Sequence, residues 1–109
     1  MFAVIYRGYI HPGHENEYKK LWKQVATYFI KNRGAIGSRL HKTTEGEYLA
    51  YSMWPDKKTR DASWGEHADI NSLPKEIIEV TEKLKLCIDK NRPYDEICMN
   101  VVEDLLMKR

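Results

Sequence analysis

The spacing between apolar residues changes repeatedly along this chain, and the order of those changes restricts the folds open to it. Residues 2–11 are rich in β-branched and aromatic side chains and end at Pro12-Gly13, which predicts a strand. Over residues 15–31 the apolar side chains recur every three or four positions, which predicts an amphipathic helix. That helical stripe consists of Tyr18, Leu21, Trp22, Val25, Ala26 and Phe29.

The rest of the chain continues this alternation between strand and helix patterns. It predicts a hairpin over 35–44 and 47–54, a short helix over 57–64, a second long helix from Ser72-Leu73-Pro74 to about residue 90, and a last strand from about Glu96 to Leu106. The order is β-α-β-β-α-β, the ferredoxin-like arrangement of an α+β fold. Such a fold has an antiparallel sheet with both long helices on one face. With 109 residues, the chain is expected to form one domain over 1–109.

The predicted strands are apolar on both sides, although the helices can cover only one side of the sheet. In the first strand Phe2, Val4 and Tyr6 point one way, and Ala3 and Ile5 point the other. The third strand repeats this pattern, with Leu49, Tyr51 and Met53 opposing Ala50 and Trp54. An exposed apolar face of this size marks an interface, and the simplest partner is a second copy of the chain. We therefore expect a homodimer formed through the sheet face.

Composition and charge argue against several classes of protein. The chain has 18 basic and 16 acidic residues, which is too balanced for a strongly electrostatic nucleic-acid binder. No apolar run approaches the roughly 20 residues of a membrane span, and the opening residues lack the pattern of a signal peptide. Cys87 and Cys98 form neither a disulfide framework nor a metal motif. These observations predict a cytoplasmic protein without a nucleic-acid or membrane partner.

A series of short motifs follows along the first two thirds of the chain. They are Val4-Ile5-Tyr6-Arg7 with Pro12-Gly13, a helix with Trp22, Gly37-Ser38-Arg39-Leu40-His41, Ala50-Tyr51-Ser52-Met53-Trp54-Pro55 and Trp64-Gly65-Glu66-His67. In order and spacing they resemble the antibiotic biosynthesis monooxygenase (ABM) family over residues 2–67. The end of the predicted last strand, 101–106, also resembles one branch of that family. The resemblance implies a dimeric α+β barrel, in agreement with the two-sided sheet.

What the resemblance implies about function is less specific than what it implies about fold. Members of the family include cofactor-independent oxygenases of polyphenols such as anthrones, haem-degrading enzymes, and proteins that handle quinones or autoinducers. The haem-degrading branch uses an Asn on the first strand, but Tyr6-Arg7 occupy that region here. The resemblance therefore implies a cofactor-independent monooxygenase acting on a small aromatic or quinonoid compound. The alternative is a non-catalytic dimeric protein that binds a ligand or serves a stress response.

A cofactor-free oxygenase needs a group that removes a proton from a phenol or enol, beside an aromatic-lined cavity. The candidate catalytic residues are His41, Arg39 and His67. Arg39 and His41 share one face of the second strand, and that face meets either a pocket or a partner. The candidate substrate-binding residues are Trp64, Trp22, Tyr51 and Arg7. For the two Trp residues the alternative is plain packing, and for Arg7 it is an ion pair with a carboxylate.

Metal and cofactor motifs are weak in this sequence. His11 and His14 flank Pro12-Gly13 and loosely suggest a metal pair, but no third ligand lies near them along the chain. The sequence contains no glycine-rich loop of the Walker or dinucleotide-binding type. We therefore expect neither a metal site nor a cofactor.

Overall fold

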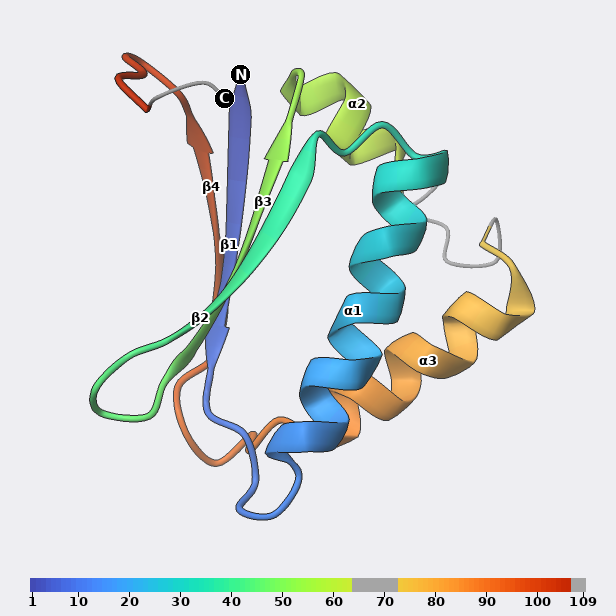
Figure 1. Cartoon of the computed structure of the whole chain (residues 1–109), viewed down its shortest axis with the longest axis vertical. Coiled ribbons are helices and arrows are strands. Elements are labelled where there is room, and N and C mark those ends of the chain that lie inside the picture. The colour runs from blue at the N-terminus through green and yellow to red at the C-terminus, as the bar shows by residue number, and fades with distance from the viewer. Residues whose placement is uncertain (64–72, 107–109) are drawn as a thin grey trace.

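A four-stranded antiparallel sheet carries two long helices on one of its faces (Figure 1). The computed structural model describes residues 1–63 and 73–106. Its elements are β1 (Phe2–Gly8), α1 (Glu15–Asn32), β2 (Gly37–Lys42), β3 (Tyr48–Trp54), α2 (Lys57–Ala62), α3 (Lys75–Leu86) and β4 (Asp95–Asn100). The strand order is β2-β3-β1-β4, and every neighbouring pair is antiparallel. The predicted ferredoxin-like α+β fold is confirmed.

The last strand is shorter than the sequence pattern predicted. β4 ends at Asn100, which pairs with Phe2 at the first position of β1. The Val101 N–H still donates to the carbonyl of Met1 at 2.9 Å. Beyond that bond the chain has left its only neighbour in the sheet, and Val102 and Leu105 are almost fully exposed. The apolar alternation over 101–106 therefore does not make a strand here.

Two other predicted elements are also shorter, and one interaction explains both. β1 was predicted to reach residue 11 and the second long helix about residue 90, but they end at Gly8 and Leu86. The segments that follow them pair with each other through an antiparallel bridge between Ile10 and Ile88. Their backbone groups satisfy one another instead of extending β1 and α3.

The register of the sheet decides which side chains face the helices. Phe2 lies opposite Trp54, and Tyr6 lies opposite Ala50, so these residues share one face with Val4. Since Phe2, Val4 and Trp54 are buried among helix residues, this is the face covered by α1 and α3. The alternation predicted for the first and third strands is confirmed.

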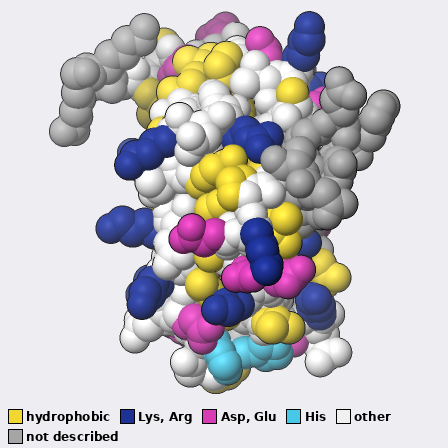
Figure 2. All heavy atoms as spheres, turned by 90° about the vertical axis from the view of Figure 1, so that its right-hand side faces the viewer, with side chains coloured by type: hydrophobic (Ala, Val, Ile, Leu, Met, Phe, Trp, Pro, Cys, Tyr) yellow, Lys and Arg dark blue, Asp and Glu magenta, His cyan; other side chains and the backbone are white. Residues whose placement is uncertain are grey.

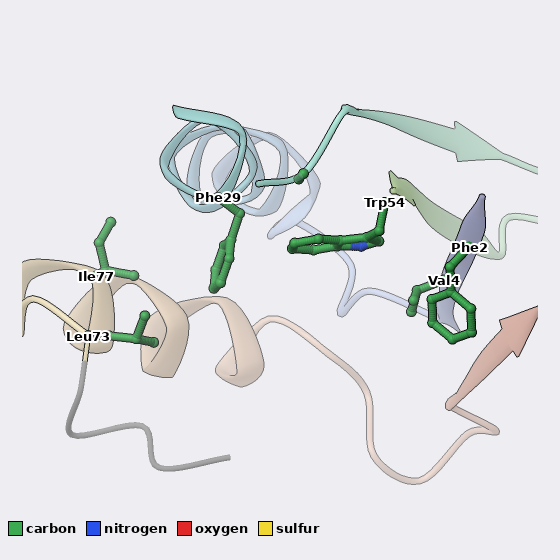
Figure 3. Packing of buried hydrophobic residues seen from close by; sticks show 7 residues of the cluster. Phe2, Val4, Phe29, Trp54, Leu73 and Ile77 are labelled. Atoms are coloured by element: carbon green, nitrogen blue, oxygen red, sulfur yellow. The ribbon is translucent and has the colours of Figure 1, made fainter. Parts of the chain in front are cut away.

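Two apolar clusters fill the layer between the sheet and the helices. The first consists of Phe2, Val4, Phe29, Ala35, Trp54, Leu73 and Ile77, and the second of Ile10, Tyr18, Leu21, Tyr48 and Cys87. In Figure 3 the ring of Phe29 projects from α1 toward the indole of Trp54, and their centroids lie 6.3 Å apart, edge to face. Contacts of this geometry add to the stabilisation that burial of the two rings provides.

The opposite face of the sheet, called here the open sheet face, is not covered by any of the described helices (Figure 1). Its apolar residues are Ala3, Ile5, Leu49, Tyr51, Met53, Ile97 and Met99. Ile97 is 36% exposed and most of the others are half-buried, which leaves a continuous apolar surface across three strands. Among the described residues, no helix has both the length and the apolarity needed to cross a membrane.

Candidate functional site

A cavity of about 280 Å³ lies where β1 and β4 meet the end of α3. Its lining residues are Tyr6, Arg7, Gly8, Ile10, Tyr18, Ile88, Tyr94, Asp95 and Glu96. Three of them are tyrosines, and the charged residues come from β1 and β4. The volume approaches the lower end of the range for small-molecule sites, and aromatic walls with a few polar groups are typical of them.

Four polar side chains meet beside this cavity, and we call them the Arg60 cluster: Tyr6, Arg60, Glu96 and Cys98. Arg60 extends from α2 and donates from Nη2 to the hydroxyl oxygen of Tyr6 at 2.7 Å. The same nitrogen donates to Oε1 of Glu96 at 2.6 Å. Glu96 Oε1 also accepts from the Cys98 thiol at 3.0 Å. Tyr6 and Glu96 also line the cavity, so the cluster borders it through these two residues.

The environment of the Arg60 cluster shifts the proton affinities of its members. Burial raises the pKa of the Tyr6 phenol, which the cationic Arg60 opposes and Glu96 reinforces. Burial alone would lower the pKa of Arg60, but the charges of Tyr6 and Glu96 raise it above its usual value. The Arg60 side chain is only 14% exposed, so its positive charge is held in a largely desolvated position. Tyr6 therefore stays a neutral phenol and Arg60 a cation near neutral pH.

Cys98 is not an activated thiol. Its hydrogen bond to Glu96 raises the pKa of the thiol, and burial adds to the rise. Since the thiolate is the nucleophilic form of cysteine, a raised pKa argues against a nucleophilic role. Cys98 instead serves as a second donor that orients the Glu96 carboxylate.

Tyr18 forms the wall of the cavity that comes from α1. Its ring packs edge to face against that of Tyr48, with centroids 5.6 Å apart. Burial raises the pKa of Tyr18 to about 12, so the phenol stays protonated over the whole physiological range. Tyr18 therefore provides an aromatic surface rather than a proton acceptor.

Arg7, a predicted substrate-binding residue, lines the cavity but also has partners of its own. Its Nε lies 3.1 Å from a carboxylate oxygen of Asp95 and 3.6 Å from one of Glu47. With 40% of its side chain exposed, these ion pairs are solvated and contribute little to stability. The ion pair that the sequence left as an alternative is present, and the register places it on the open sheet face, since Arg7 lies opposite Leu49 and Asp95.

The other predicted site residues lie away from this cavity or outside the described ranges. Arg39, His41 and Tyr51 all project from the open sheet face, where Arg39 pairs with Tyr51 across β2 and β3. Trp22 is half-buried on α1 and belongs to neither of the two apolar clusters. Trp64 and His67 fall within 64–72, outside the residues that the structure describes. Of the seven predicted residues, the structure places Arg7 at the cavity.

Sequence reasoning missed the Arg60 cluster because its members come from three separate elements. Arg60 lies 54 positions from Tyr6 and 36 from Glu96 along the chain. One signal was available: the alternation put the Tyr6 phenol on the same side of the first strand as Phe2 and Val4, and the structure shows that this side faces the helices. No local pattern could pair it with a guanidinium on the short helix.

Comparison with known proteins identifies the fold independently. Rv0793 from Mycobacterium tuberculosis superposes with a TM-score of 0.71 at 14% identity, over 96% of this chain and 98% of that one. SnoaB, a cofactor-independent oxygenase from Streptomyces nogalater, superposes with a TM-score of 0.72 at 13% identity, over 95% of both chains. A conserved protein from Methanosarcina mazei Go1 gives a TM-score of 0.66 at 17% identity, over 88% of this chain and 89% of that one. At these identities the likeness concerns the fold.

Sequence comparison is more specific than the structural likeness. No curated protein matches the chain. The family model described as "Antibiotic biosynthesis monooxygenase" matches residues 1–69, which include β1, α1, the β2–β3 hairpin and α2. Together with the fold, this match confirms the resemblance found in the sequence motifs: the chain belongs to the antibiotic biosynthesis monooxygenase family.

Proposed function

We propose that this protein is a cofactor-independent monooxygenase that oxidises a small hydroxylated aromatic compound in the cavity beside the Arg60 cluster. The observation that carries the proposal is the contact of a half-buried cation, Arg60, with a neutral phenol and a carboxylate, both from residues that line the cavity. Family membership and the fold shared with SnoaB, a cofactor-independent oxygenase, support the reaction class.

The reaction needs no reductant when the substrate carries an activated CH₂ group between aromatic rings. The substrate loses a proton to give a carbanion, which transfers one electron to O₂, and the two radicals combine to form a C–O bond. The resulting hydroperoxide loses its second C–H proton as the O–O bond breaks, and hydroxide leaves as water. The CH₂ group becomes a ketone: one oxygen atom enters the product, the other enters water, and the four electrons come from the substrate carbon.

The Arg60 cluster can supply the two groups that the first step requires. In this proposal Glu96 accepts the proton, since it is a lining residue of the cavity and its carboxylate is held by Arg60 and Cys98. Arg60 and the Tyr6 hydroxyl then stabilise the enolate oxygen of the deprotonated substrate. A fixed cation in a poorly solvated site acts more strongly on such an anion than the same cation in water.

The test uses the purified protein with a panel of anthrones and hydroquinones. Absorbance is recorded first without and then with O₂, and oxygen uptake is measured once O₂ is present. Glu96→Gln keeps the shape of the carboxylate but removes the base, so we expect turnover to fall about 100-fold or more. Arg60→Leu is also expected to lower turnover. Lys58→Leu, which removes an exposed cation from the same helix, is the matched control and should retain turnover. Full activity of Glu96→Gln would contradict the assignment of the base.

The site residues predicted from the sequence define other places where the reaction could occur. Turnover that survives Glu96→Gln but is lost in His41→Ala or Arg39→Ala would place the reaction on the open sheet face. Loss only in Trp64→Phe or His67→Ala would place it beside the end of the short helix. Spectral shifts on ligand addition without oxygen uptake would support the non-catalytic ligand-binding alternative.

We also propose that two chains form a homodimer through their open sheet faces. The apolar surface spreads over β1, β3 and β4, and its central residue is Ile5, flanked by Tyr51 and Ile97. An uncovered apolar surface of this kind is costly in water, and a two-fold partner would bury it against itself. In such a dimer Arg39, His41 and Tyr51 would contact or rim the partner.

A further inference from the structure

A tight turn before α1 places two histidines side by side. The His14 N–H donates to the carbonyl of His11 at 3.0 Å, and Gly13 between them has a φ of +87°. Pro followed by a residue of positive φ is the arrangement of a type II turn. The rings of His11 and His14 consequently lie 6.2 Å apart, edge to face. The side chain of His14 makes no helix-capping hydrogen bond, although His14 is the N-cap of α1.

The fold brings a cysteine from the far end of the chain to this turn. The His11 N–H donates to the carbonyl of Cys87 at 2.9 Å, and the Asp89 N–H donates to the carbonyl of Tyr9 at 2.8 Å. These bonds flank the bridge between Ile10 and Ile88, so Cys87 is held at a defined position next to the turn. Cys87 is 2% exposed, and its thiol makes one long contact, 3.6 Å, to the carbonyl of Lys83.

Three potential metal ligands therefore converge at one end of the molecule. A ring nitrogen of His14, a carboxylate oxygen of Glu17 and the sulfur of Cys87 all lie within 4.8 Å of one another. His14 Nδ1 and Glu17 Oε2 are 3.7 Å apart. In a tetrahedral zinc site, bonds of about 2.0–2.3 Å place neighbouring ligand atoms about 3.3–3.8 Å apart. Small side-chain rotations would bring the three atoms to that spacing.

We propose that His14, Glu17 and Cys87 bind a divalent transition metal, with Zn²⁺ as the best match. Imidazole, carboxylate and thiolate together are zinc ligands, and one thiolate with one carboxylate neutralises the 2+ charge. Binding deprotonates Cys87: the metal–sulfur bond forms, the S–H bond breaks, and the proton goes to solvent, with no change of oxidation state. A water molecule or, after ring rotation, His11 completes the coordination.

The location indicates a structural role. Two ligands come from the first turn of α1 and the third from the end of α3, so the metal would tie the two long helices together at their meeting point. Figure 2 shows histidine side chains gathered at the lower end of this side of the molecule, with acidic side chains close by. The site is therefore open to solvent on its histidine side and closed on its cysteine side. It is separate from the Arg60 cluster and does not depend on the proposed function.

The test is a Co²⁺ titration of the untagged, reduced, full-length chain, followed by absorbance. Co²⁺ bound to a thiolate gives a near-ultraviolet charge-transfer band, which reports cysteine ligation directly. We expect this band at one equivalent of Co²⁺ per chain, and its loss when Zn²⁺ is added. Zn²⁺ should also raise the Tm. The absence of the band in wild-type protein would overturn the proposal.

Matched variants identify the ligands. Cys87→Ala should abolish the band, whereas Cys98→Ala, which removes the other thiol, should retain it. Because Cys87 is buried and its replacement can impair folding, His14→Gln provides a second test on the exposed side, where 54% of the side chain is accessible. We expect it to weaken Co²⁺ binding by at least the roughly 10- to 100-fold that losing a supporting partner costs. An unchanged band in Cys87→Ala, or unchanged affinity in His14→Gln, would show that the metal binds elsewhere.

Discussion

At the residue scale, this protein buries polar side chains that change the pH dependence of its stability. Tyr18 is the clearest case, since burial raises its pKa from 10.0 to about 12. The folded state therefore holds the phenolic proton more tightly than the unfolded chain does. The resulting stability is fully present below pH 10 and is lost as the pH rises toward 12. A shift of this size corresponds to about 2–3 kcal/mol.

Tyr18→Phe should consequently flatten the loss of stability between pH 10 and pH 12. It removes the ionisable phenol but keeps the ring that packs against Tyr48. Urea unfolding at a series of pH values measures the effect, with Tyr94→Phe, at an exposed position, as the control for losing one tyrosine. If Tyr18→Phe loses stability between pH 10 and pH 12 as steeply as wild type does, ionisation of Tyr18 is not the cause of that loss.

At the scale of the element, α2 depends on its N-cap because it has only six residues and none of them is buried. The Asp56 carboxylate accepts a hydrogen bond from the Thr59 N–H at 2.7 Å. Hydrogen bonds from Thr59 hold the pKa of Asp56 below its usual value. The cap is therefore complete above the ordinary carboxyl pKa and is lost as the pH falls. α2 also positions Arg60, so this cap supports the candidate site.

We expect Asp56→Ala to destabilise α2 and to accelerate backbone hydrogen exchange over residues 57–62. Asp56→Asn retains a side-chain acceptor and should restore much of the protection. Exchange measured by mass spectrometry compares the two variants with wild type. Equal exchange in Asp56→Ala and wild type would mean that contacts other than the cap hold α2.

At the scale of the whole molecule, the open sheet face is an apolar surface that no described helix covers. A fold of this size normally covers large apolar surfaces, yet the described residues leave one sheet face without a covering layer. Its apolar side chains come from β1, β3 and β4. Those of β1 and β3 alternate with core residues, whereas Ile97 and Met99 of β4 alternate with exposed residues. The same alternation that builds the core therefore builds the surface proposed to join two copies.

Ile5→Glu should separate such a dimer into monomers. The substitution places a charge at the centre of the open sheet face, where burial against a second copy would leave it unpaired. Light scattering should give twice the chain mass of 12.9 kDa for wild type and the single mass for the variant. Leu86→Glu changes an apolar residue that is 74% exposed on α3 and should remain dimeric. A wild-type protein of single mass at low micromolar concentration would rule out the dimer.

The sequence by itself determined the order of the elements and the two-sided character of the sheet. Both follow from the spacing of apolar residues within short segments, and β1, α1 and β3 are found close to where that spacing predicted them. The predicted ends of the helices and strands were less accurate. β4 is shorter than its apolar alternation predicted because residues form a strand only where a neighbouring strand pairs with them. The position of that neighbouring strand depends on the whole sheet.

The tertiary structure alone decided which functional groups meet. It placed Arg39 and His41 on the open sheet face and assembled Tyr6, Arg60 and Glu96 beside the cavity instead. In the same way it brought Cys87 from a distant part of the chain to His14 and Glu17, which are neighbours in the sequence. Periodicity tells which side of its own element a residue occupies. Contacts between elements depend on strand register and helix packing, which no local pattern encodes.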